Sequence, residues 1–275
     1  AADQSASLQS ALNTASAYTR KQVQIGSGIF PIKDVQIPAG TWLRGDGKEK
    51  TVLSRFSAVT DAILKFAAGA GNITISDLTI DGMTAADARS MVSMGAHGSN
   101  IRFERVRFQN GMDRWALRGD PASYFENLDV IDCEFVDCPA GGPIILANGD
   151  GAKGSRNINF VGNTFLRCGG NLCGLRPNGN GFLFDWWYAV KFNYNRVLDC
   201  TDTGTDGPIP VEIWGANGFQ QIGNYLDSGT RGLAAGAGQR NGVIAHNLIM
   251  NQTGYAMEGG NNVDNVHIHS NLAIN

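Results

Sequence analysis

The chain has 275 residues, of which 43% are hydrophobic and 17% are charged, and its formal net charge at pH 7 is −3. This composition supports a sizeable folded core, and the 36 glycines indicate many turns rather than disorder because the charged fraction is low. The slightly negative charge argues against a nucleic-acid partner, and no run of about 18 apolar residues is present to insert into a membrane.

The segment that contains residues 1–20 differs in pattern from the rest of the chain. Polar capping residues at its start are followed by apolar residues at helical spacing, such as Leu8 and Leu12. This pattern predicts a short amphipathic helix within residues 5–16. We expect the helix to cover an open end of the core that follows.

Residues 21–71 contain short apolar runs that are separated by glycines. Such runs are typical of strands bounded by turns. The strand candidates are residues 23–25, 29–32 and 51–53. We expect this segment to form the first coils of a repeating fold.

From residue 72 onward, one sequence phrase recurs down the chain. Its clearest copy is Asn157–Cys168, and copies begin at residues 72, 100, 127, 157, 189, 218, 241 and 265, which are 23 to 32 residues apart. This spacing is typical of solenoids, in which each repeat buries its apolar face by stacking on its neighbours.

Hydrophobic alternation inside the phrase predicts strands rather than helix. Ile158 and Phe160 alternate with polar residues, Asn163 marks a bend, and Phe165 opens a second short run. The counterparts of Asn163 in later copies are Asn195, Asn224, Asn247 and Asn271. We expect these asparagines to take the left-handed backbone conformation at the bend and to hydrogen-bond to one another across coils.

Cys138, Cys168 and Cys200 occupy one position of the phrase in successive copies. Side chains in neighbouring coils lie about 4.8 Å apart, so disulfides are one possibility. We favour buried, stacked and reduced thiols that behave as small hydrophobic groups, in a chain that folds in a reducing compartment.

Together, these features resemble the pectate-lyase-like superfamily of right-handed parallel β-helices. Its N-terminal signature is similar to the Leu8–Leu12 helix, the Val23–Phe30 strand pair and the segment from Leu43 to Gly47 that precedes Thr51–Leu53. The superfamily includes phage tailspikes and polysaccharide hydrolases, lyases and epimerases. The resemblance implies a fold and a class of substrate, but no single reaction.

The implied fold class is all-β, a right-handed parallel β-helix of roughly nine coils with a short N-terminal capping α-helix. One domain then spans residues 1–275, with the cap helix in 1–20, the first coils in 21–71 and regular asparagine-bearing coils in 72–275. Since the last coil would expose a sheet edge, we expect that a further segment was removed from this end or that a partner subunit covers it.

Candidate chemistry follows from where such coils tolerate insertions. In the family's order, the bend at Asn163 leaves little room, so variable loops flank the remaining strand of each coil. Because side chains alternate along a strand, that strand presents one outward row. The expected row is Arg118, Leu146, Arg176, Glu212, Ala234 and Glu258. A slip of one residue would exchange Glu212 for Trp214.

The longest insertions, residues 149–156, 177–188 and 201–210, belong to neighbouring coils and bring acidic and aromatic residues towards Arg176 and Glu212. Carboxylates beside aromatic rings are what saccharide cleavage requires. We expect Glu212 to be the acid or nucleophile, Asp185 or Asp206 its partner, and Arg176 a clamp on an acidic sugar. Stacking platforms are expected at Trp186 and Trp187. Further substrate-binding candidates are Arg118, Tyr188, Trp214, Glu258 and Asp150.

The predicted function is therefore depolymerisation of a polysaccharide by glycoside hydrolysis. One alternative is a lyase or a uronate epimerase, which needs a base for the C5 proton and a cation such as Arg176, Arg118 or Lys153. Another is a non-catalytic adhesin or stalk. We expect neither a metal site nor a cofactor, except a calcium ion if the protein is a lyase.

The expected setting is extracellular or the virion, as in a phage tail, with no nucleic-acid partner and no membrane insertion. Short solenoids with exposed ends associate side by side in the tailspike group, which the sequence resembles. We therefore expect a homotrimer in the intact protein, with a polysaccharide as its binding partner.

Overall fold

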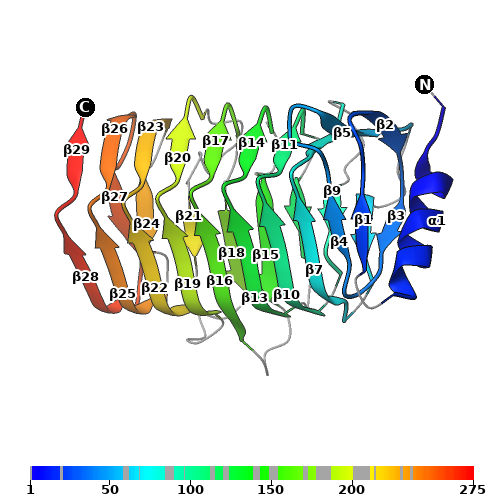
Figure 1. Cartoon of the computed structure of the whole chain (residues 1–275). Coiled ribbons are helices and arrows are strands. Elements are labelled where there is room, and N and C mark those ends of the chain that lie inside the picture. Colours follow the sequence, from blue (N-terminus) through cyan, green and yellow to red (C-terminus); the bar gives the residue numbers. More distant parts are fainter. Residues whose placement is uncertain are drawn as a thin grey trace.

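The chain winds into a long stack of coils with a helix at one end (Figure 1). The structure is a computed structural model that describes residues 2–18, 21–57, 62–67, 69–83, 90–95, 97–111, 115–119, 124–138, 143–148, 154–169, 173–177, 187–200, 211–213, 215–229, 232–235 and 238–275. After α1 (Ser5–Ser16), the strands visit three sheets in turn, which we name A, B and C.

All strand pairs in these sheets are parallel. Sheet A consists of β1 (Gln22–Gln24), β4 (Trp42–Arg44), β7 (Gly71–Ser76), β10 (His97–Glu104), β13 (Tyr124–Ile131), β16 (Ser155–Val161), β19 (Trp187–Asn193), β22 (Ala216–Ile222), β25 (Arg240–Ala245) and β28 (Asp264–His269). Sheet B consists of β2 (Gly28–Ile32), β5 (Thr51–Arg55), β8 (Thr79–Asp81), β11 (Arg107–Gln109), β14 (Glu134–Val136), β17 (Thr164–Leu166), β20 (Arg196–Leu198), β23 (Tyr225–Gly229), β26 (Leu248–Gln252) and β29 (Leu272–Ile274). Sheet C consists of β3 (Val35–Ile37), β6 (Ala62–Phe66), β9 (Ser90–Ser93), β12 (Leu117–Arg118), β15 (Ile144–Asn148), β18 (Cys173–Pro177), β21 (Val211–Ile213), β24 (Leu233–Ala235) and β27 (Met257–Gly259).

The predicted all-β, right-handed parallel β-helix with an N-terminal helix is confirmed. The number of coils differs from the roughly nine expected, because sheets A and B each contain ten strands within the described residues. Copies of the repeated phrase account only for the coils from β7 onward. The coils that begin with β1 and β4 precede the first copy, where short strands and irregular turns obscure the repeat.

The helix α1 closes the first coil by pairing its polar side chains with an edge strand. Gln9 Nε2 donates to the carbonyl oxygen of Gln36 at 3.0 Å, and the Gln36 backbone N–H donates to Gln9 Oε1 at 2.8 Å. Leu12 on the same helix is completely buried against the core. The helix therefore satisfies edge groups of β3 that would otherwise be open to pairing with another chain. Among the described residues, no helix is long and apolar enough to cross a membrane.

The bend between sheets A and B corrects one expectation. The left-handed residue is the one before each buried asparagine: Gly162 has a φ of 69° and Gly223 has a φ of 67°, whereas Asn163 does not have a positive φ. Left-handed asparagines occur instead at the start of the phrase, as at Asn157 with a φ of 56°. This division leaves the side chain of Asn163 free to point into the coil interior.

The buried asparagines at the bends form a column of amide hydrogen bonds. Asn195 Oδ1 accepts from the backbone N–H of Asn163 at 2.9 Å and from Asn163 Nδ2 at 3.0 Å. Asn195 Nδ2 donates to the carbonyl oxygen of Phe160 at 3.0 Å. The same pattern continues through Asn224 and Asn247. Each bend is thereby tied to the coils on both sides.

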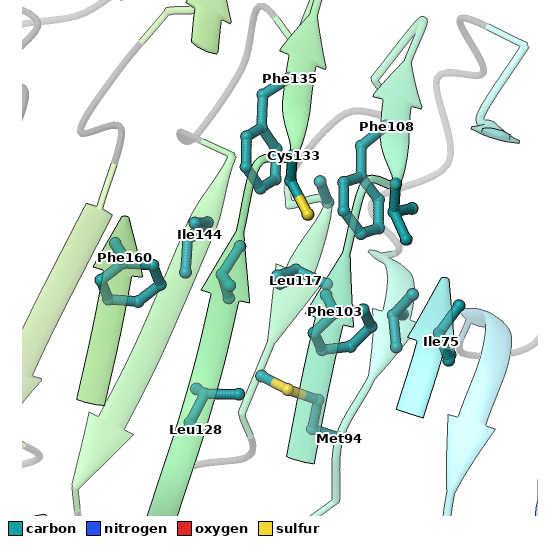
Figure 2. Close-up of a cluster of buried hydrophobic side chains, with 14 of the residues drawn as sticks. Ile75, Met94, Phe103, Phe108, Leu117, Leu128, Cys133, Phe135, Ile144 and Phe160 are labelled. Carbon is teal, nitrogen blue, oxygen red and sulfur yellow. The ribbon is translucent and has the colours of Figure 1, made fainter. Parts of the chain in front are cut away.

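The interior is filled by ladders of like side chains in successive coils. Phe135 stacks on Phe108 with ring centroids 5.0 Å apart and on Phe165 at 4.9 Å. Figure 2 shows Phe108 and Phe135 beside Cys133 in this core. Since stacked strands repeat at about 4.8 Å, one ring per coil fills the space continuously.

The expected burial of Cys138, Cys168 and Cys200 is confirmed, and all three are unpaired thiols in the structure. The Cys168 Sγ donates to the carbonyl oxygen of Phe135 at 3.3 Å. Burial raises the pKa of the Cys168 thiol well above its ordinary value, and it raises the pKa of Cys133 to about 12. The thiolate, which is the reactive form, is therefore strongly disfavoured at these sites.

We predict that these three thiols are reduced and resist alkylation in the native protein. Iodoacetamide at pH 8 should leave Cys138, Cys168 and Cys200 unlabelled in the folded chain and should label them after denaturation in urea. Peptide mass spectrometry measures both states. A disulfide between any two of them, or fast labelling of the native protein, would contradict the prediction.

Candidate functional site

The predicted row of functional residues lies on sheet C, and the strand register shows how its members align. Arg118 pairs with Ile145, Ile145 pairs with Gly174, and Gly174 pairs with Glu212. The expectation that Leu146 belongs to this row is wrong by one residue, because Leu146 pairs with Leu175. The sequence of the five-residue strand β15 does not reveal this offset, because both Ile145 and Leu146 fit its apolar pattern.

Arg176 and Glu212 lie diagonally across adjacent strands of sheet C. Arg176 pairs with Ala147 and lies two residues beyond Gly174, the register partner of Glu212. Because successive residues of a strand alternate between its two faces, positions 174 and 176 belong to the same face of sheet C. Gly174, the register partner of Glu212, has no side chain. The register therefore places one acidic and one basic residue on adjacent strands of sheet C.

Three connections that contain predicted site residues adjoin sheet C strands along the chain. One follows β15 and precedes β16, one follows β18 and precedes β19, and one follows β20 and precedes β21. Each of them therefore begins or ends at a strand of sheet C, namely β15, β18 or β21. The predicted site residues Asp150, Asp185, Trp186, Asp206 and Trp214 lie outside the described residues.

The described part of the row is basic towards the N-terminal end. Lys65 pairs in register with Ser93, and Ser93 pairs with Arg118, whose side chain is half-buried. Lys65 Nζ forms an ion pair with Asp34 at 2.9 Å. At the other end of sheet C, Glu258 is exposed on β27. The row therefore changes from basic to acidic along the solenoid axis.

Two of the predicted aromatic residues lie at the start of strand β19 in sheet A instead of in the connection before it. The role of Trp187 as a stacking platform is wrong, because its side chain is completely buried on β19. Its register partners, Ser155 and Ala216, are small and leave space inside the coil for an indole ring. Tyr188 is exposed on the same strand, so it remains accessible beside the connection that follows β18.

A network of charged residues that no sequence motif indicated lies on sheet A and in the bends between sheets A and B. Arg105 donates to Asp77 through Nε at 2.6 Å, which holds the pKa of Asp77 below its ordinary value. Arg102 donates to Glu104 at 2.9 Å with the same effect on the pKa of Glu104. Carboxylates held ionised in this way are suited to structural ion pairs, whereas a general acid needs a raised pKa.

No protein-family model and no curated protein matches the sequence. Among solved structures, the A-module of the mannuronan C-5 epimerase AlgE6 from Azotobacter vinelandii is 16% identical with a TM-score of 0.50, over 99% of this chain and 95% of that one. PfbA, a surface adhesin of Streptococcus pneumoniae, is 13% identical with a TM-score of 0.51, over 99% of this chain and 90% of that one.

Tailspike protein 2 of the Escherichia coli O157:H7 bacteriophage CAB120 is 11% identical with a TM-score of 0.48, over 99% of this chain and 37% of that one. Identities this low establish a shared architecture and nothing about chemistry. The AlgE6 A-module and PfbA share the parallel β-helix architecture of this chain.

Proposed function

We propose that this protein binds a polysaccharide across sheet C and depolymerises it by glycoside hydrolysis. The observation that carries the proposal is the register of sheet C. Glu212 lies opposite Gly174 and diagonal to Arg176 on adjacent strands of this sheet.

The shape of this face suits a polymer better than a small metabolite. Parallel strands stacked in register form a long, rigid surface, whereas small molecules favour enclosed pockets. A glycine beside Glu212 lets a sugar ring approach the strand that carries the carboxyl group. In this proposal, the partner carboxylate of Glu212 is Asp185 or Asp206, which belong to the connections before β19 and β21.

In this proposal, Glu212 acts as acid or nucleophile and Arg176 binds an acidic group of the sugar. Trp186 provides the stacking surface, since Trp187 is buried in the core. The distance between the two carboxyl groups determines the stereochemical outcome: about 5–5.5 Å implies retention and about 6.5–9.5 Å implies inversion.

A second candidate is chemistry at C5 of a uronate polymer, either β-elimination or epimerisation. Arg176 on the strand next to Glu212 favours it, because a cation stabilises the enolate that forms when a base removes the C5 proton, and Arg118 lies three strands away in the same row. The AlgE6 A-module, whose fold this chain shares, is named as an epimerase of mannuronan. A non-catalytic glycan-binding role, as in an adhesin, is the third candidate.

Product analysis distinguishes these functions. The protein is incubated with capsular, lipopolysaccharide and plant acidic polysaccharides, and reducing ends and unsaturated uronates are measured. Hydrolysis releases reducing ends without unsaturated products, β-elimination releases both, and epimerisation changes the C5 configuration without cleavage. Binding with none of these changes identifies an adhesin, and the hydrolase proposal is then wrong. The homotrimer and the virion or cell-surface setting stay predictions.

A further inference from the structure

A second feature suited to binding lies on sheet A. A shallow groove of about 350 Å³ crosses β7, β10 and β13, and six of its seven lining residues have polar side chains. The lining residues are Asn72, Thr74, Asn100, Ile101, Arg102, Asn127 and Asp129. These strands belong to sheet A, whereas Glu212 lies on β21 of sheet C, which is a different face of the solenoid.

One wall of the groove is a row of exposed amides. Asn100 Nδ2 donates to Asn72 Oδ1 at 3.0 Å, and Asn127 Nδ2 donates to Asn100 Oδ1 at 2.8 Å. Left-handed backbone conformations, with φ values of 53° at Asn100 and 59° at Asn127, hold these side chains in line. A primary amide has two N–H groups and two lone pairs, so each keeps hydrogen-bonding capacity for a ligand.

The floor of the groove is a register row in which charges compensate one another. Thr74 pairs with Arg102, and Arg102 pairs with Asp129. Arg102 Nη1 lies 3.4 Å from Asp129 Oδ2, and Arg102 Nε donates to Glu104 Oε2 at 2.9 Å. The floor therefore offers many donors and acceptors but no excess of positive charge, which makes it a poor site for a polyanion.

An aromatic ring continues this row towards the N-terminus. Trp42 pairs in register with Thr74 and is 40% exposed. Its indole N–H donates to Ser76 Oγ at 3.1 Å, and the Arg44 guanidinium lies 5.9 Å from the ring centroid. The ring is thereby fixed in orientation next to the groove.

We propose that this groove is a second carbohydrate-binding surface, which holds an uncharged stretch of polysaccharide along the solenoid axis. Fixed amides and hydroxyls that repeat at about 4.8 Å suit a hydroxyl-rich polymer, and aromatic faces pack against sugar rings. The surface holds substrate without cutting it. It does not depend on the chemistry proposed for sheet C, because it shares no residue with that row.

The test uses the whole chain and the double variant Asn100→Gly with Asn127→Gly. Glycine adopts the left-handed conformation without strain, so the variant removes the amides and keeps the backbone. The probes are uncharged hexasaccharides derived from cellulose, mannan and galactan, with a polymannuronate hexasaccharide as the charged comparison. Calorimetry measures affinity, and NMR follows the side-chain amide signals of Asn72, Asn100 and Asn127 in the wild-type protein.

Asn241→Gly is the matched control. Asn241 has the same left-handed conformation, with a φ of 53°, and donates to Asn217 Oδ1 at 2.9 Å, but it lies outside the groove. We expect at least one uncharged probe to shift the groove amides. The double variant should weaken that probe about tenfold or more, since two or more hydrogen bonds are lost, and the control should change affinity less than about twofold.

Three results would overturn this proposal. They are an absence of binding by every uncharged probe, equal weakening in the control, and binding of the polymannuronate probe alone. Glu212→Gln separates this surface from the proposed active site, because that variant should leave the groove signals and the affinity of the uncharged probe unchanged. A protein that binds at the groove but cleaves nothing supports this inference and refutes only the hydrolase.

Discussion

Glu212→Gln is expected to lower the rate of polysaccharide cleavage by about 10²–10⁴-fold while polymer affinity stays within about twofold. Glutamine keeps the shape and the hydrogen-bonding reach of the side chain but cannot donate or accept a proton as a carboxyl group does. The substitution leaves the backbone pairing of β21 with β18 through Gly174 unchanged. Initial rates of reducing-end release and polymer binding by calorimetry measure the two effects separately.

Glu126→Gln provides the matched control for this experiment. Glu126 lies on β13 in sheet A, its side chain is 47% exposed, and its carboxylate is 4.0 Å from Arg156 Nε. An exposed pair of this kind contributes little to stability, so the control should retain wild-type cleavage. If Glu212→Gln cleaves at the wild-type rate, Glu212 is structural, and the search for the acid moves to the residues around Arg118.

Asn195→Ala is expected to lower the free energy of unfolding by about 4 kcal/mol, because it leaves buried polar groups without partners. The substitution removes the acceptor of the Asn163 backbone N–H and the donor to the Phe160 carbonyl oxygen. Both Asn163 and Asn195 are completely buried, so water cannot replace these bonds. Urea unfolding followed by circular dichroism measures the change.

The control for the buried column is Asn159→Ala in the neighbouring strand β16. Asn159 donates to Asp129 Oδ1 at 2.8 Å from a half-buried position, where water can take over the interaction. The expected loss is below about 1 kcal/mol. Similar losses for the two variants would show that the buried amides do not hold the bends together.

Much of the architecture follows from the sequence alone, because its signals are local and repeated. Alternation around Ile158 and Phe160 predicts a strand wherever the coil lies, and one phrase repeated at 23 to 32 residues requires stacked units. The helix at residues 5–16 is predicted by spacing within a single segment. Alignment of Cys138, Cys168 and Cys200 is sufficient to predict that three thiols share one buried ladder.

Only the tertiary structure decided which residues face each other across coils. Coil lengths vary, so an apolar strand does not reveal whether Ile145 or Leu146 belongs to the row, and this choice decides which residue lies between Arg118 and Gly174. Burial of Trp187 depends on the small side chains of its neighbours in adjacent coils, Ser155 and Ala216. The groove on sheet A likewise combines residues from three coils. Such features arise from packing between segments distant in sequence, which a local pattern does not encode.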